Sequence, residues 1–171
     1  MSIFATARRV ATVGLLTFVG AAWAEESKIS IGEIPKPVIE AVRRKFPACE
    51  MIQAQKETED GKITYEIGLK DKGAMVDVAV TASGKIVEIE KVITPKDLPR
   101  AVMSSVEVKY PGATINKVEQ IVEFEDDEEE ISYEVSLTTK DKKSLELNLS
   151  PKGKIIEDEK EEHEGKGDKK D

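Results

Sequence analysis

The stretch LPRAVMSSVEVKYPGA, Leu98 to Ala113, is a helix-sized segment with a proline near each end. Sixty-four residues earlier, Ile34 to Ala48 reads IPKPVIEAVRRKFPA, with prolines and apolar residues at matching positions. The matched pairs are Pro35 with Pro99, Val38 with Val102, Val42 with Val106, Phe46 with Tyr110 and Pro47 with Pro111. The chain therefore contains one unit written twice, which predicts two similar folded units.

Both stretches have the pattern of an amphipathic helix. Their apolar residues recur at spacings of one, three and four, which places them on one stripe of a helix. The leading proline, at the expected first helical position, lacks an N–H that would be unbonded there, and the second proline ends the helix. Each helix is therefore expected to pack its apolar stripe against a sheet. The stripes are Val38, Ile39, Val42 and Phe46 in the first copy and Val102, Met103, Val106 and Tyr110 in the second.

Alternating apolar and polar residues after each helix predict strands. The segments are 63–69, 76–80 and 86–91 in the first copy, and 131–137, 145–149 and 155–157 in the second. Segments 50–58 and 115–124 alternate less clearly and are expected to supply one more strand per copy, with their faces unassigned. The predicted fold class is α+β, with two tandem units that each pack an N-terminal helix on an antiparallel sheet of three to four strands. The two sheets are either separate or joined into one continuous curved sheet.

The chain divides into four segments. Residues 1–24 are interpreted as a signal peptide, 25–93 as the first unit, 94–160 as the second unit and 161–171 as a charged tail. No apolar residue follows Ile156, so the chain is predicted to become disordered from about Glu157 onward. Two loosely joined domains are the alternative to units that share a seam.

The N-terminal segment has the layout of a secretory signal. Arg8 and Arg9 precede a short apolar run, and Ala22-Trp23-Ala24 provides small residues at a cleavage site. An uncleaved anchor and a twin-arginine signal are the alternatives. We therefore expect a periplasmic or secreted protein. Without residues 1–24 the chain keeps 24 basic and 34 acidic residues, a net charge of −10, which argues against nucleic acid and anionic membrane surfaces as partners.

The polar sheet face is the candidate surface for a protein partner. Side chains that alternate with the apolar set point away from the helices. The candidate partner-binding residues are Glu66, Asp77, Ser132, Glu134, Ser136, Glu146 and Asn148.

An acidic run, Glu123 to Glu130, lies in the first hairpin of the second copy. Such a run predicts a solvated, mobile loop. The alternative is a weak cation site, because oxygen ligands suit calcium, although the run lacks the pattern of an EF-hand loop. Its candidate ligands are Glu125, Asp126, Asp127 and Glu128.

The residues needed for common catalytic sets are missing from the predicted folded region. His163, the only histidine, lies in the tail, so no Ser-His-Asp triad or multi-histidine metal site can form there. Cys49 is the only cysteine, which excludes an intrachain disulfide; we interpret it as a half-buried packing residue, with an intermolecular disulfide or a reactive thiol as the alternative. We predict no catalytic residue, no cofactor and no enzymatic activity.

The repeated pattern resembles the PepSY-like domains, whose fold is related to that of beta-lactamase inhibitor protein. The resemblance rests on the two helical stretches, on Tyr65-Glu66-Ile67 with Gly84-Lys85-Ile86, and on Tyr133-Glu134-Val135 with Gly153-Lys154-Ile155. It implies an exported, non-catalytic binding module that inhibits or regulates a peptidase or another envelope hydrolase. The alternative is an envelope protein that binds a cation or small ligand at residues 123–130.

Overall fold

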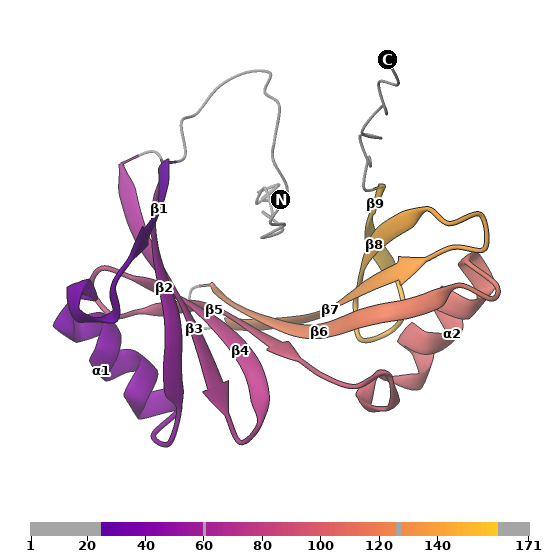
Figure 1. The fold of residues 1–171 in the computed structure, drawn as a ribbon. Helices are drawn as coiled ribbons and strands as arrows, with labels where there is room; N and C mark the ends of the chain where they lie inside the picture. The colour runs from indigo at the N-terminus through magenta and orange to yellow at the C-terminus, as the bar shows by residue number, and fades with distance from the viewer. Residues whose placement is uncertain (1–24, 60, 126–127, 161–171) are drawn as a thin grey trace, which may run out of the picture.

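The structure is a computed structural model that describes residues 25–59, 61–125 and 128–160. In these ranges nine strands form one antiparallel sheet in which every strand pairs with its neighbours in chain order (Figure 1). The two sheets expected from the repeat are therefore joined into one. The predicted signal peptide and the tail beyond residue 160 lie outside the described residues.

The elements follow one another along the chain in the same order in both halves. The first half contains β1 (Glu25–Ile29), η1 (Ile31–Glu33), α1 (Lys36–Lys45), β2 (Glu50–Glu59), β3 (Lys62–Asp71), β4 (Ala74–Thr81) and β5 (Ile86–Val92). The second contains η2 (Pro95–Asp97), α2 (Arg100–Lys109), β6 (Thr114–Glu125), β7 (Glu128–Thr138), β8 (Ser144–Leu149) and β9 (Ile155–Lys160).

Both helices begin one residue later than expected, because Pro35 and Pro99 occupy the N-cap position. A short 3-10 turn that the sequence analysis missed precedes each one. In the first, the Ser30 N–H and hydroxyl both donate to the Glu33 carboxylate, at 2.8 and 2.7 Å. Thr94 and Asp97 repeat this pair before α2. Because the turn satisfies its own polar groups, it fixes the direction from which the chain enters each helix.

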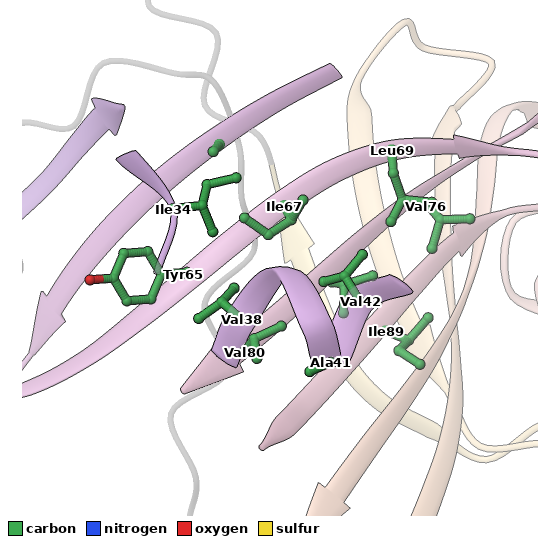
Figure 2. Close-up of a cluster of buried hydrophobic side chains, with 12 residues drawn as sticks. Ile34, Val38, Ala41, Val42, Tyr65, Ile67, Leu69, Val76, Val80 and Ile89 are labelled. Carbon is green, nitrogen blue, oxygen red and sulfur yellow. The ribbon is translucent and has the colours of Figure 1, made fainter. Parts of the chain in front are cut away.

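Each helix packs on its own hydrophobic cluster. The first cluster joins α1 to β2–β5, as Figure 2 shows for Val38, Ala41 and Val42 against the strands. The second joins α2 to β6–β8. Cys49 is half-buried against the first cluster, as expected. The fully buried side chains in the two clusters are Val38, Val42, Ile67, Leu69, Val76, Val78, Val80, Val102, Val118, Val135, Leu137, Leu147 and Leu149.

Both clusters lie on the same face of the sheet. Ile89 of the first cluster pairs with Val122 across β5 and β6. Val118 of the second cluster is four residues from Val122 on the same strand, and side chains separated by an even number of residues share a face. The helices therefore cover the two ends of one face, and the sheet curves away from them to leave a concave face opposite (Figure 1).

The acidic hairpin differs from the predicted mobile loop. Strands β6 and β7 stay paired as far as Glu125 and Glu128. Phe124 packs against the first cluster, and the Lys45 ammonium lies 5.6 Å from the centre of its ring. Phe124 was expected to lie in a charged loop. Its ring instead packs against the first half of the chain and so connects the two halves.

Two other strand boundaries differ from the prediction. β1 was not predicted, because EESKI lacks an alternating apolar pattern; it joins the sheet through backbone pairing with β2. β9 continues to Lys160, whereas disorder was predicted from about Glu157. Backbone pairing with β8 needs no apolar side chain, and charged residues are common on edge strands.

Candidate functional site

The candidate site is the concave face of the sheet, opposite the helices. On β3 and β4, Glu66 and Asp77 alternate with buried residues of the first cluster. The second-half candidates on β7 and β8 alternate in the same way with residues of the second cluster. All seven predicted residues thus lie on this face, although in two groups, Glu66 and Asp77 in the first half and the other five in the second.

Strands β5 and β6 connect these two groups with side chains that the sequence analysis did not select. On β5, Glu88 pairs with Ala79 and Glu90 pairs with Asp77. The alternation of Val87-Glu88-Ile89-Glu90 was visible in the sequence and could have identified both glutamates. On β6, Glu119 pairs with Glu134, and it was missed because the face of this strand was unassigned.

Carboxylates therefore oppose each other directly across several strand pairs, among them Asp77 with Glu90, Glu88 with Glu123 and Glu119 with Glu134. Like charges in direct opposition destabilise a sheet. We name Glu66, Asp77, Glu88, Glu90, Glu119 and Glu134 the carboxylate face. Sheet stability alone would favour paired side chains of opposite charge at these positions, and not pairs of carboxylates.

Burial divides this face into an accessible half and a covered half. Glu66, Asp77, Glu88 and Glu90 are half-buried. In contrast, Glu119 is only 4% exposed and Glu134 8% exposed. The first half of the face is therefore more accessible than this part of the second, where Ser132 and Asn148 are buried too.

A buried isoleucine explains part of this coverage. Ile121 is 1% exposed yet belongs to neither hydrophobic cluster. It lies two residues from Glu119 on the same face and pairs with Glu90 on one side and Ser132 on the other. An apolar side chain among carboxylates lowers the local polarity, which makes each negative charge more costly.

Electrostatics on the accessible half reflect burial and crowding. Burial, followed by the charges of Asp77 and nearby glutamates, raises the pKa of Glu66 to about 7. Burial, followed by the charge of Glu88 and then those of Glu119, Glu134 and Asp77, raises the pKa of Glu90 to about 8. Burial and the charge of Glu119 also raise the pKa of Asp77. Glu66 and Glu90 therefore resist ionisation near neutral pH unless a positive charge approaches.

Lys117 is a cation within the carboxylate face. Its ammonium lies 2.8 Å from Oε2 of Glu119. Burial lowers the pKa of Lys117, but the hydrogen bond to Glu119 and the charges of Glu119, Glu134 and Glu90 outweigh burial and raise it overall. One lysine therefore neutralises part of the negative charge near β6.

The remaining predicted residues take part in local contacts on the second half. The Ser136 hydroxyl donates to Oε1 of Glu146 at 3.3 Å. Asn148 pairs with Glu134 across β7 and β8, and its buried Oδ1 accepts no hydrogen bond within the described residues. These contacts position the side chains at the covered end of the face.

Of the four predicted cation ligands in the acidic hairpin, the structure describes only Glu125 and Glu128. Glu125 and Glu128 pair across β6 and β7, while Asp126 and Asp127 lie outside the described residues. Across residues 25–59, 61–125 and 128–160, no group of three or more His, Cys, Asp or Glu side chains is arranged to hold a metal ion.

Solved structures with the same fold come from several Bacteroides species. A DUF2874 family protein from Bacteroides uniformis aligns with a TM-score of 0.62 and 15% identity, covering 74% of this chain and 88% of that one. A structure named "putative periplasmic proteins" from Bacteroides eggerthii gives 0.61 and 14%, covering 75% and 90%. A BLIP-like protein from Bacteroides fragilis gives 0.59 and 15%, covering 75% and 88%. No curated protein matches the sequence.

The fold thus belongs to the class of curved antiparallel sheets that carry helices on one face. The family described as beta-lactamase-inhibitor-like and PepSY-like matches this chain twice, over residues 18–88 and 76–157. The chain belongs to this PepSY-like family and contains two tandem copies of its domain. Neither helix in the part of the chain that the structure describes is long and apolar enough to cross a membrane.

Proposed function

We propose that this protein is a non-catalytic module of the cell envelope that binds another exported protein and inhibits or regulates it. The partner in this proposal is a hydrolase or peptidase, and the binding surface is the carboxylate face. The observation that carries the proposal is the group of half-buried carboxyls with raised pKa values on the accessible half, Glu66, Asp77 and Glu90.

Crowded carboxyls of this kind are costly to the fold. Strongly perturbed titratable groups gather at functional sites more often than elsewhere, and the direct opposition of Asp77 and Glu90 lowers the stability of the fold. A partner that brings lysine or arginine to this face recovers that cost on binding, because each cation restores the ionised state. We therefore expect the partner to present a basic surface.

The exported location is supported by two independent features. The N-terminal residues have the layout of a secretory signal, and the similar structure from Bacteroides eggerthii carries a periplasmic name. The inhibitory role is supported by the description of the family and by the BLIP-like name of the Bacteroides fragilis protein. Beta-lactamase itself is a weak candidate, because the only tryptophan, Trp23, lies in the predicted signal, and large aromatic anchors dominate many inhibitor interfaces.

The test is affinity capture from the envelope fraction of the source organism with immobilised protein, residues 25–171. We expect one or a few exported proteins to bind the wild type. The double variant Glu66→Gln/Glu90→Gln should bind them at least about tenfold more weakly, because a charged group lost from a contact costs about 1.5–3 kcal/mol. The matched control Glu128→Gln/Glu129→Gln makes the same two substitutions at exposed positions of the hairpin and should bind like the wild type.

Two results would contradict the proposal. Equal capture by both double variants would show that the carboxylate face is not the contact surface. Capture of basic proteins alone, all released equally by moderate salt, would indicate non-specific attraction to an acidic chain. An activity assay on each captured hydrolase, with and without the module, then separates inhibition from simple binding.

A further inference from the structure

An accessible hollow whose lining includes none of the carboxylate face lies at the C-terminal end of α2. It has a volume of about 290 Å³ and lies between the residues that follow α2 and the hairpin that joins β7 to β8. Leu145, Tyr110 and Pro111 supply apolar wall, and the charged residues around it are Lys109, Lys140, Lys143 and Asp141. An apolar surface with several cations around it is a combination that the proposed function does not use.

The charges around this hollow leave one lysine available. Lys109 forms an ion pair with Asp158, to which the Tyr110 hydroxyl also donates at 2.9 and 3.0 Å. Lys143 lies 2.6 Å from Asp141. Among the described residues Lys140 has neither an ion pair nor a hydrogen bond from its side chain. In a chain this acidic, the hollow is a local positive site.

The lack of a side chain at Gly112 leaves space for the side chain of Lys140. A Cβ placed on Gly112 would lie 2.8 Å from the Lys140 ammonium and closer still to its Cε, so the lysine stem lies directly over this glycine. The first copy has Ala48 at the matching position, and its hairpin after β3 turns through Lys72 and Gly73 alone. The packing of Lys140 against Gly112 is therefore found in the second copy and has no equivalent in the first.

We propose that this hollow binds the C-terminal residue of a peptide or protein, with Lys140 receiving the terminal carboxylate and Tyr110, Pro111 and Leu145 contacting an apolar side chain. A carboxylate next to an apolar group matches a free ammonium beside an apolar wall. The volume is at the small end of ligand sites, which run from about 300 to 1,000 Å³, so it suits one terminal residue and not a longer segment. The site is separate from the carboxylate face and does not depend on it.

The experiment titrates the mature protein with the peptide Ac-Ala-Ala-Phe carrying a free C-terminal carboxylate, and with the same peptide as its C-terminal amide. Binding is followed by calorimetry and by the NMR shifts of Ala113 and Thr139, which also line the hollow. We expect the carboxylate form to bind at least about tenfold more tightly than the amide, because a charge-assisted hydrogen bond contributes about 1.5–3 kcal/mol.

Substitution of the lysines completes the test. Lys140→Met should weaken binding of the carboxylate peptide about tenfold and leave the amide peptide unchanged. Lys142→Met removes an equal charge from the same turn, at a position that does not line the hollow, and should bind like the wild type. Equal binding of the two peptides, shifts that miss Ala113 and Thr139, or equal losses in both lysine variants would overturn the proposal.

Discussion

Acid should stabilise this protein between pH 8 and pH 5, and replacement of Glu90 should remove much of that effect. The pKa of Glu90 is about 8 in the folded chain, where burial and then the charge of Glu88 raise it from 4.5. Between these two values the folded state holds a proton that the unfolded state has released. The contribution of Glu90 to the free energy of unfolding is therefore largest below pH 4.5 and falls as pH rises toward 8.

The magnitude follows from the size of the shift. A full pKa difference of this size corresponds to about 1.4 kcal/mol per pH unit across the window, and to about 5 kcal/mol as an upper limit for an isolated group. Glu90 interacts with several neighbouring carboxyls and is not an isolated group, so we expect a measured loss of about 2–3 kcal/mol between pH 5 and pH 8. Glu66, with a pKa of about 7, changes stability in the same direction. The chain has a single histidine, so imidazole groups contribute little to this window.

Urea unfolding of the wild type, Glu90→Gln and Glu129→Gln at pH 5, 6, 7 and 8 measures this directly. Glu90→Gln should be about 2 kcal/mol more stable than the wild type at pH 8 and about equal to it at pH 5. Glu129→Gln removes an exposed charge from the hairpin and should follow the wild type. A wild-type stability that rises from pH 5 to pH 8, or an unchanged slope in Glu90→Gln, would refute the reasoning.

Two further predictions concern packing. Gly84 has φ +87° and its added Cβ would lie 2.7 Å from the Pro37 carbonyl oxygen in the first turn of α1, whereas Gly73 has φ +90° with open space around it. Gly84→Ala should therefore cost about 2–4 kcal/mol against about 1–2 for Gly73→Ala, and equal urea midpoints for the two variants would contradict this packing of helix on turn. Phe124→Ala should lower the free energy of unfolding by about 1–2 kcal/mol, because a half-buried ring and its contact with Lys45 are lost; a hairpin unattached to the first half would show no change.

Periodicity predicted the central elements because their apolar residues carry the packing. Val102 and Val106 recur at helical spacing, and Tyr133 and Val135 recur at the two-residue spacing of a strand. Burial of these residues therefore appears in the sequence as a periodic pattern. The same alternation placed Glu66 and Asp77 on the face away from the helices. The turns beginning at Ser30 and Thr94 were missed, although their matched spacing is visible once the repeat is aligned.

Features that depend on backbone pairing, or on contacts between distant parts of the chain, produce no periodic pattern in the sequence. β1 and the end of β9 join the sheet through main-chain hydrogen bonds. These bonds form whether or not the side chains are charged. Glu119 and Ile121 share a strand whose face was unassigned, and only pairing with β5 and β7 shows that both belong to the carboxylate face. Phe124 was read as part of an acidic run because its partner cluster lies in the other half of the chain.

The most direct test of the proposed function is site-specific photo-cross-linking in the periplasm of the source organism. A photoreactive phenylalanine at Ala79, which pairs with Glu66 and Glu88, reports contacts at the carboxylate face, and the same group at Val108, 80% exposed on α2, reports the opposite side. We predict a discrete adduct with an exported protein from position 79 that disappears when Glu66→Gln and Glu90→Gln are added, and no such adduct from position 108. Identical adducts from both positions, or none from position 79, would contradict the assignment of this face as the binding surface.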